Sequence, residues 1–136
     1  CNDSRRTSMS EIKTDKLTGV GTAGSIVVTG EGNSTTTNLQ QGLAKVWVRF
    51  NGSGTIAVDD SLNVASLTDV GTGDYQVNFT NNMGNINYAN TSNSNNAHAL
   101  NGNPNAADNL RVGTYNSATS LVDSARVHSV AQGDLA

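Results

Sequence analysis

The chain has 136 residues, of which 35% are hydrophobic, 4% are aromatic and 14% are charged, and its formal net charge is −3. This length suits a single domain of ordinary size, and so low a charge argues against a disordered polyelectrolyte. The basic residues are scattered, whereas nucleic-acid binding needs clustered Lys and Arg, so we expect no nucleic-acid partner.

The N-terminal residues are polar, and no apolar run approaches the roughly 20 residues that span a bilayer. We therefore expect no membrane insertion. No apolar signal-peptide segment follows Cys1–Arg6, so we expect a soluble chain that is not exported by that route. Cys1 is the only cysteine, which argues against an intrachain disulfide and a thiolate metal cluster. Met9 is an alternative start, with residues 1–8 as an upstream remnant.

Residues 1–42 are predicted to form an N-terminal arm or stem rich in Gly and Thr, with one apolar patch at Ile26–Val28. A single short strand is not stable in water, so this patch needs a partner. Either the arm packs on the following domain, or the arms of neighbouring copies wrap together into a stem. A flexible tail is the third alternative.

Residues 43–136 are predicted to form the folded body, because apolar and polar residues alternate in short segments between turns. On 43–50, Val46, Val48 and Phe50 are expected to face the core. Strands are predicted at 43–50, 55–58, 62–68, 74–80, 85–89, 109–115 and 124–131. This pattern is typical of an all-β, antiparallel β-sandwich, which we expect to be jelly-roll-like.

An Asn-rich segment at 81–109 is predicted to be a long loop, because Asn tolerates left-handed backbone angles and bonds its own main chain. Long loops are often functional, so a recognition loop is one interpretation and solvated turns are the other. The candidate recognition residues are Asn95, Asn96, His98, Asn101, Asn103 and Asn105.

Trp47 is the only tryptophan, and Lys45 and Arg49 share its side of the predicted strand. Such a set fits a platform that stacks on a glycan. It also fits a subunit interface, where aromatic residues and Arg are enriched, and we favour the interface.

A catalytic or metal site is not expected. The chain has two histidines, His98 and His128, and no Gly-x-Ser-x-Gly motif. Its Asp residues lie at predicted turns and strand ends, where Asp commonly bonds the backbone. Metal alternatives are Ca²⁺ at Asp59, Asp60, Asp69 and Asp74, and a shared metal at His128 in a symmetric oligomer. We expect no enzyme activity, no cofactor and no metal.

Two runs carry a resemblance to a known class of proteins. They are residues 39–55 (LQQGLAKVWVRFNGSGT) and 60–80 (DSLNVASLTDVGTGDYQVNFT), preceded by a start at 9–15 (MSEIKTD). Together they resemble tail-fibre-like virion proteins of tailed phages, especially phages of marine bacteria and cyanobacteria. The similarity covers residues 9–90 and is loose beyond them, and it assigns no site residues.

The resemblance implies a virion location and a homotrimer whose distal part touches the host surface. We therefore expect a non-enzymatic tail-fibre-like protein that contributes to attachment through a host glycan or protein, with its arm contacting other virion proteins. The alternatives are a capsid decoration or head-fibre protein held to the shell by its arm, and, less favoured, a surface-polysaccharide depolymerase.

Overall fold

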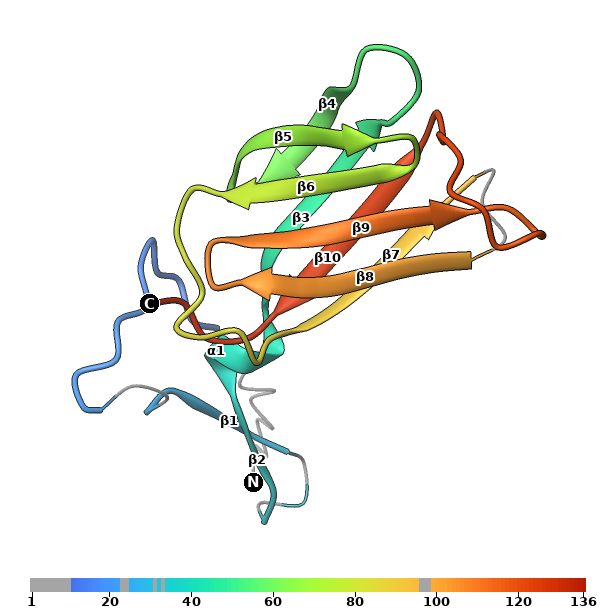
Figure 1. Ribbon diagram of the computed structural model, residues 1–136. Coiled ribbons are helices and arrows are strands. Elements are labelled where there is room, and N and C mark those ends of the chain that lie inside the picture. Colours follow the sequence, from blue (N-terminus) through green and yellow to red (C-terminus); the bar gives the residue numbers. More distant parts are fainter. Residues whose placement is uncertain (1–10, 23–24, 31, 33, 96–98) are drawn as a thin grey trace, which may run out of the picture.

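The computed structural model describes residues 11–22, 25–30, 32, 34–95 and 99–136. Strands make up 53% of the structure and helix 3%, and the sheets are antiparallel, which confirms the predicted all-β class. The body consists of two four-stranded sheets, with the strands of one running across those of the other (Figure 1).

We call the two sheets of the body sheet I and sheet II. Sheet I contains β3 (Ala44–Asn51), β4 (Ala57–Leu62), β7 (Ala89–Ser94) and β10 (Val127–Gln132), in the order β4-β3-β10-β7. Sheet II contains β5 (Val64–Gly71), β6 (Asp74–Phe79), β8 (Ala99–Ala106) and β9 (Asn109–Tyr115), in the order β5-β6-β9-β8.

The core lies between the sheets, because each contributes alternate apolar side chains to it. Phe50 of sheet I and Tyr75 of sheet II meet edge to face, with ring centroids 5.2 Å apart. The predicted burial of alternate residues on 43–50 and 74–80 is confirmed. The buried apolar residues are Val46, Val48, Phe50, Tyr75, Val77, Phe79, Met83, Tyr88, Leu110, Val112, Val127 and Ala131.

Asn63 carries the chain from β4 in sheet I to β5 in sheet II. Its φ is 60°, in the left-handed region that Asn tolerates better than most residues. Its side chain bonds the backbone of Asn81 in both directions: Asn63 Nδ2 donates to Asn81 O (2.9 Å), and Asn81 N donates to Asn63 Oδ1 (2.7 Å). A single residue thus forms the corner and fixes the segment after β6 to it.

The interior is polar where β7 contacts β8. Ser92 Oγ of β7 is 3.0 Å from Ser129 Oγ of β10. Asn90 Nδ2 is buried and has no hydrogen-bond partner among the described residues. A Cβ placed on Gly102 of β8 would lie 2.1 Å from that nitrogen, so a side chain at this position would have to displace the Asn90 amide. We call this region the polar seam.

Several predicted boundaries are wrong. Residues 85–88 have no strand, and β7 begins at Ala89. The last strand begins at Val127 rather than 124, and the segments 55–58 and 62–68 are displaced to 57–62 and 64–71. Turn residues flank each of these segments, and they do not determine at which residue a strand begins or ends.

The Asn-rich segment is not a long loop, so that interpretation is wrong for most of it. It contains β7, which pairs with β10, and β8, which pairs with β9. Asn has a low strand propensity in isolation, but pairing with an apolar neighbouring strand overrides that preference. The two central strands β9 and β10 supply the apolar contacts that β7 and β8 lack.

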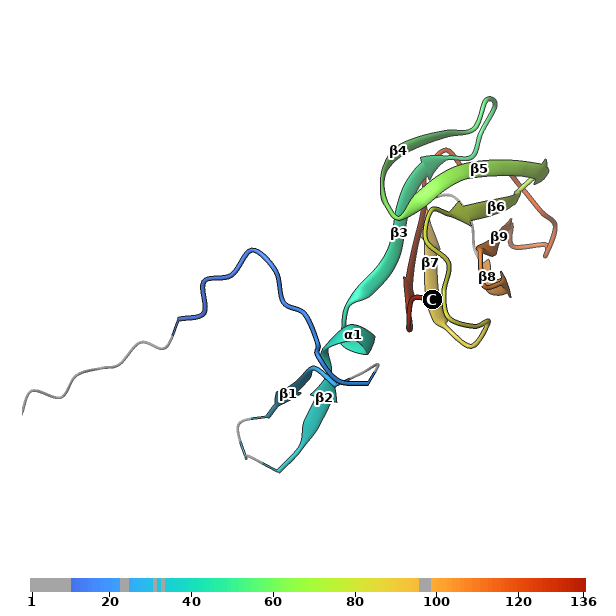
Figure 2. The same cartoon turned by 90° about the vertical axis from the view of Figure 1, so that its left-hand side faces the viewer.

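The described part of residues 11–42, which were predicted as an arm, extends away from the two sheets (Figure 2). It contains a two-stranded ribbon of β1 (Val27–Thr29) and β2 (Thr36–Asn38), followed by the single turn α1 (Leu39–Gly42). Asn38 Oδ1 caps this turn by accepting from Gln40 N (2.8 Å) and Gln41 N (3.2 Å). The apolar patch thus pairs with β2 of its own arm, and Val27 and Val28 stay about half exposed.

Candidate functional site

A shallow groove crosses the outer face of sheet II on the neighbouring strands β6, β9 and β8. Strand pairing places Asp74 opposite Gly113, and Gly113 opposite Asn101. Residues directly opposite one another point to the same face of a sheet, so side chains from three distant segments converge there. The groove has a volume of about 190 Å³ and is lined by Asp74, Asn101, Asn103, Asn105, Arg111, Gly113 and Tyr115. We call it the sheet II groove.

One wall of the groove is a two-pronged ion pair. Arg111 Nε donates to Asp74 Oδ1 (2.6 Å), and a second guanidinium nitrogen donates to Asp74 Oδ2 (2.7 Å). The hydrogen bond with Asp74 raises the pKa of Arg111 above its ordinary value, so the guanidinium stays charged. Each charge compensates the other, and the groove therefore has no net charge.

The aromatic ring in the groove is that of Tyr115, which lies over Gly113. A Cβ on Gly113 would be 3.0 Å from Tyr115 Cε2 and 3.2 Å from its hydroxyl oxygen. The ring thus covers the strip of backbone that a side chain at position 113 would otherwise fill. This packing holds the ring beside the ion pair with part of its surface exposed.

Asn101, Asn103 and Asn105 form a row on the outer face of β8, because alternate residues of a strand share a face. All three are exposed. Asn105 Nδ2 donates to Asn109 Oδ1 (2.7 Å), which fixes one end of the row. Within the described part of the chain, no side-chain hydrogen bond occupies the amides of Asn101 and Asn103.

Lys45, Trp47 and Arg49 lie on the outer face of sheet I, as their alternation with the core residues predicts. Trp47 is flanked by Leu62 of β4 and Val130 of β10, which are paired with it. Leu62 is 47% exposed and Val130 is 40% exposed. The three side chains form an apolar row across the sheet, which we call the Trp47 row.

Charged residues border this row. Arg49 forms an ion pair with Asp59 (3.3 Å) and lies opposite His128. Lys45 Nζ donates to the backbone oxygens of Gln40 and Leu43, the latter at 3.1 Å. Lys45 therefore bonds the turn at the base of the arm.

The remaining candidate residues do not join either group. Asn95, at the end of β7, accepts from Ser124 Oγ (3.1 Å) and lines a separate hollow with Arg126 and His128. Asn96 and His98 lie outside the described residues. The predicted recognition set thus divides, and its β8 members belong to the sheet II groove.

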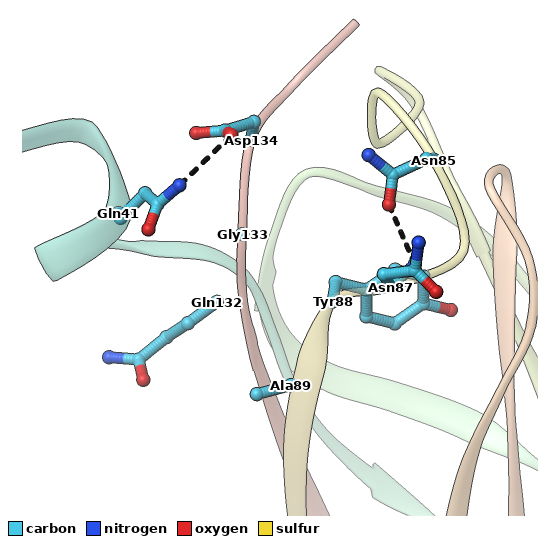
Figure 3. Close-up of a pocket in the computed structure, with 8 residues that line it drawn as sticks. All are labelled: Gln41, Asn85, Asn87, Tyr88, Ala89, Gln132, Gly133 and Asp134. Carbon is cyan, nitrogen blue, oxygen red and sulfur yellow. Dashed lines mark hydrogen bonds between the residues drawn. The ribbon is translucent and has the colours of Figure 1, made fainter. Parts of the chain in front are cut away.

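Another hollow, of about 280 Å³, lies where α1 meets the end of the sandwich (Figure 3). Gln41 Nε2 reaches across to donate to Asp134 Oδ2 (3.1 Å), while Asn87 N donates to Asn85 Oδ1 (2.7 Å). Tyr88 turns its hydroxyl away and donates to Asn109 O (2.6 Å). The bond from Gln41 to Asp134 connects α1 to the C-terminal end of the chain, so we assign this hollow to the attachment of the arm.

The described residues contain no group of three or more His, Cys, Asp or Glu side chains that could hold a metal ion. Two of the candidate Asp residues bond nearby backbone instead. Asp60 Oδ1 accepts from Ser61 N (2.8 Å), and Asp69 Oδ1 accepts from Gly71 N (3.1 Å). Nor does the described chain include a helix of the length and apolarity that a membrane crossing requires.

Sequence reasoning selected Asn101, Asn103 and Asn105, considered Asp74 as a Ca²⁺ alternative, and missed Arg111 and Tyr115. Part of the signal was present, because 74–80 was predicted as a half-buried strand with a polar face and 109–115 was predicted as a strand. What was lacking was the pairing of β6 with β9 and of β9 with β8.

Comparison with protein-family models, curated proteins and solved structures finds no match for this chain.

Proposed function

We propose that this chain is a non-enzymatic attachment module of a virion appendage of the tail-fibre class. In this proposal the sheet II groove contacts the host surface, and the arm connects the module to other virion proteins. The resemblance of residues 9–90 and the layout of an arm followed by a β-sandwich support it. The jelly-roll-like description of the sandwich, the virion location and the homotrimer remain part of the proposal.

The observation that carries the proposal is the exposed polar chemistry on a rigid sheet face. Asn101 and Asn103 offer amides that no described side chain occupies, beside the partly exposed ring of Tyr115. Recognition sites gain affinity when their polar groups are positioned before the ligand arrives. β8 and β9 supply that positioning by pairing in register from Ala99 to Pro104, the part of β8 that holds both residues.

The Trp47 row supports self-association on the opposite face. A row of Leu62, Trp47 and Val130 rimmed by charged residues has the composition of a subunit interface, with an apolar centre and a polar rim. Asp59 and Asp60 lie on the β4 side of the row and Arg126 and His128 lie toward its β7 side. Contacts between neighbouring copies can therefore pair opposite charges.

Capsid decoration is the second candidate, and the exposed apolar side chains of the arm favour it. Leu17, Val20 and Val27 are each more than half exposed, which suits an arm that lies on a larger shell. A depolymerase is less favoured, because Asp74, the carboxylate that lines the groove, is held by both prongs of Arg111.

Adsorption to bacterial cells tests the attachment function. The fluorescently labelled full chain is mixed with a panel of strains, and we expect adsorption to a subset of them. The Asn101→Ala/Asn103→Ala variant should lose adsorption, whereas Asn93→Ala, an exposed residue on the outer face of β7, should retain it. Adsorption to no strain, or equal loss in both variants, would contradict the proposal.

Light scattering tests the oligomer separately. We expect a mass three times that of the 14.1 kDa chain. Trp47→Gln should reduce the mass to that of the monomer without unfolding the sandwich, because the side chain lies outside the core. A trimer that survives this substitution would place the contacts elsewhere, and a monomeric wild type would favour the decoration alternative.

A further inference from the structure

We infer that the sheet II groove binds a neutral saccharide, with Tyr115 as the stacking platform and Asn101 and Asn103 as the hydrogen-bonding pair. This inference rests on the proposed attachment function and names the ligand class of the same site. Four properties of the groove lead to it: its charge, its polar groups, its aromatic ring and its size.

The charge of the groove favours a neutral ligand. A site for phosphate or carboxylate needs a cation that is free to pair with the ligand. The guanidinium of Arg111 already makes two short bonds to Asp74 (2.6 and 2.7 Å), so an anion would have to displace a carboxylate. Two of the five guanidinium N–H donors are used in this way, and the others can still donate to neutral oxygen atoms.

The polar groups of the groove match hydroxyls. Each Asn amide both donates and accepts, as does each sugar hydroxyl, so adjacent hydroxyls of one ring can bond a single amide in both directions. Asn101 and Asn103 are two residues apart on one strand, which spaces them by about 6.8 Å. That spacing lets the two amides contact opposite sides of one ring.

The ring of Tyr115 supplies the apolar part of the contact. Sugar rings carry C–H groups on one face, and these pack against an aromatic surface that is flat and partly exposed. The glycine at 113 leaves room for the ring to lie along the sheet, with Cε2 only 3.0 Å from where a Cβ would be. A ring held in this way loses little conformational freedom when the ligand binds.

The size of the groove indicates how much of the ligand it holds. Pockets for drug-sized ligands enclose about 300–1,000 Å³. The sheet II groove, at about 190 Å³, is smaller and open along the sheet. It therefore suits one or two sugar units of a longer chain that continues across the surface, as in a cell-surface polysaccharide.

Binding of defined polysaccharides to the full chain tests the inference. The neutral probes are mannan, dextran and galactomannan, and the acidic probes are alginate and polygalacturonate, each cast in a native gel that retards a bound protein. We expect at least one neutral probe to retard the chain and the acidic probes to leave it unaffected. Retardation by acidic probes alone, or by none, would overturn the inference.

Variants locate the binding. Asn103→Ala and Tyr115→Leu should each weaken binding to the retarding probe at least about fivefold, through loss of hydrogen bonds or of stacking. Tyr115→Phe keeps the ring and should keep most of the affinity. Asn93→Ala is the matched control on sheet I and should bind as the wild type does. If Tyr115→Leu does not fold, the exposed Asn101→Ala variant replaces it, and wild-type binding by both Asn variants would overturn the assignment.

The single tryptophan reports which face is used. Trp47 lies on sheet I, away from the groove. Its fluorescence should therefore stay unchanged when the neutral probe binds. A shift or quenching that saturates with binding would move the saccharide to the Trp47 face and overturn the inference.

Treated cells separate this inference from the attachment function. Periodate cleaves the vicinal diols of saccharides, whereas protease removes surface proteins. Adsorption that is lost after periodate supports the saccharide. Adsorption that survives periodate and is lost after protease overturns the saccharide but leaves the attachment function. Retardation by a neutral probe without adsorption to any strain supports the saccharide site but overturns the attachment function.

Discussion

The two outer faces of the sandwich are built on one core but differ in chemistry. Across sheet I runs the apolar Trp47 row, in which Leu62 and Val130 are each more than 35% exposed. Across sheet II runs a groove of Asn, Tyr and a compensated Arg–Asp pair. Strand alternation makes each outer face independent of the core, so one scaffold can carry an apolar surface on one side and a polar groove on the other.

The largest loss of stability should come from truncation of Phe50, whose side chain packs between the two sheets. Phe50 is fully buried and packs edge to face on Tyr75. We expect Phe50→Ala to lower the free energy of unfolding by about 3–5 kcal/mol. The Trp47 row and the sheet II groove should be disrupted together, because both depend on the packing of the two sheets. Urea denaturation measures the loss of stability, with Val70→Ala on an exposed position of β5 as the control. A loss below about 1 kcal/mol would mean that the sheets are held together elsewhere.

Alkaline pH should weaken the connection between β9 and the segment before β7. Burial raises the pKa of Tyr88 from 10.0 to about 12, and its hydroxyl donates to Asn109 O (2.6 Å). The unfolded tyrosine ionises near its ordinary pKa, so this contribution is complete below pH 10 and is lost as the pH rises towards 12. The loss should be on the order of 2 kcal/mol.

Urea midpoints at several alkaline pH values measure this loss. Tyr88→Phe should be less stable than the wild type near neutral pH but should fall less steeply above pH 10. Some slope should remain, because burial also raises the pKa of Tyr75. Parallel profiles for the wild type and the variant would contradict the assignment.

A substitution in the polar seam should disturb the sheet II groove more than the Trp47 row, because Gly102 lies on β8. A side chain at position 102 would collide with Asn90 Nδ2 (2.1 Å) and Ser92 Oγ (2.6 Å). We expect Gly102→Ala to lower the free energy of unfolding by roughly 1–3 kcal/mol and to displace the Asn row of β8. Gly84→Ala, where the nearest atom would be 3.6 Å away, is the control. An equal loss of unfolding free energy in the two variants would mean that close packing at Gly102 does not stabilise the sandwich.

The smallest effects should distinguish the ion pairs of the two faces. Arg111 and Asp74 form a two-pronged pair with side chains 35% and 26% exposed, whereas Arg49 and Asp59 form a looser pair at 3.3 Å with 48% and 43% exposed. Asp74→Asn should lower the thermal midpoint, and Asp59→Asn should leave it within error, because exposed pairs are screened by water. The opposite order would mean that the groove is not preorganised by its pair.

Much of the scaffold could be predicted from the sequence, because its central strands carry a strong alternating signal. Val46, Val48 and Phe50 on β3, and the strand at 109–115, were identified from that pattern alone. β7 and β8 were missed because their inner side chains, such as Asn90, Ser92 and Gly102, are polar or absent. Without an apolar face they have the composition of a loop.

The groove was predicted only in part for a related reason. The Asn residues of β8 attract attention in the sequence, but their neighbours Asp74 and Arg111 are brought to them by strand pairing. β6 must align in register with β9, which follows it by about 35 residues in the chain, before the site exists. Local residue patterns carry no information on that alignment, so it requires the structure.

The way in which β3 leaves the arm has a mechanical consequence. β3 follows α1 almost directly and is hydrogen bonded on both sides, to β4 and to β10. Backbone bonds in antiparallel sheets lie perpendicular to the strands, so a pull through the arm along β3 strains both ladders at once in shear. A strand anchored in this way resists tension better than one that peels from an edge, and the sandwich can therefore withstand tension applied through the arm.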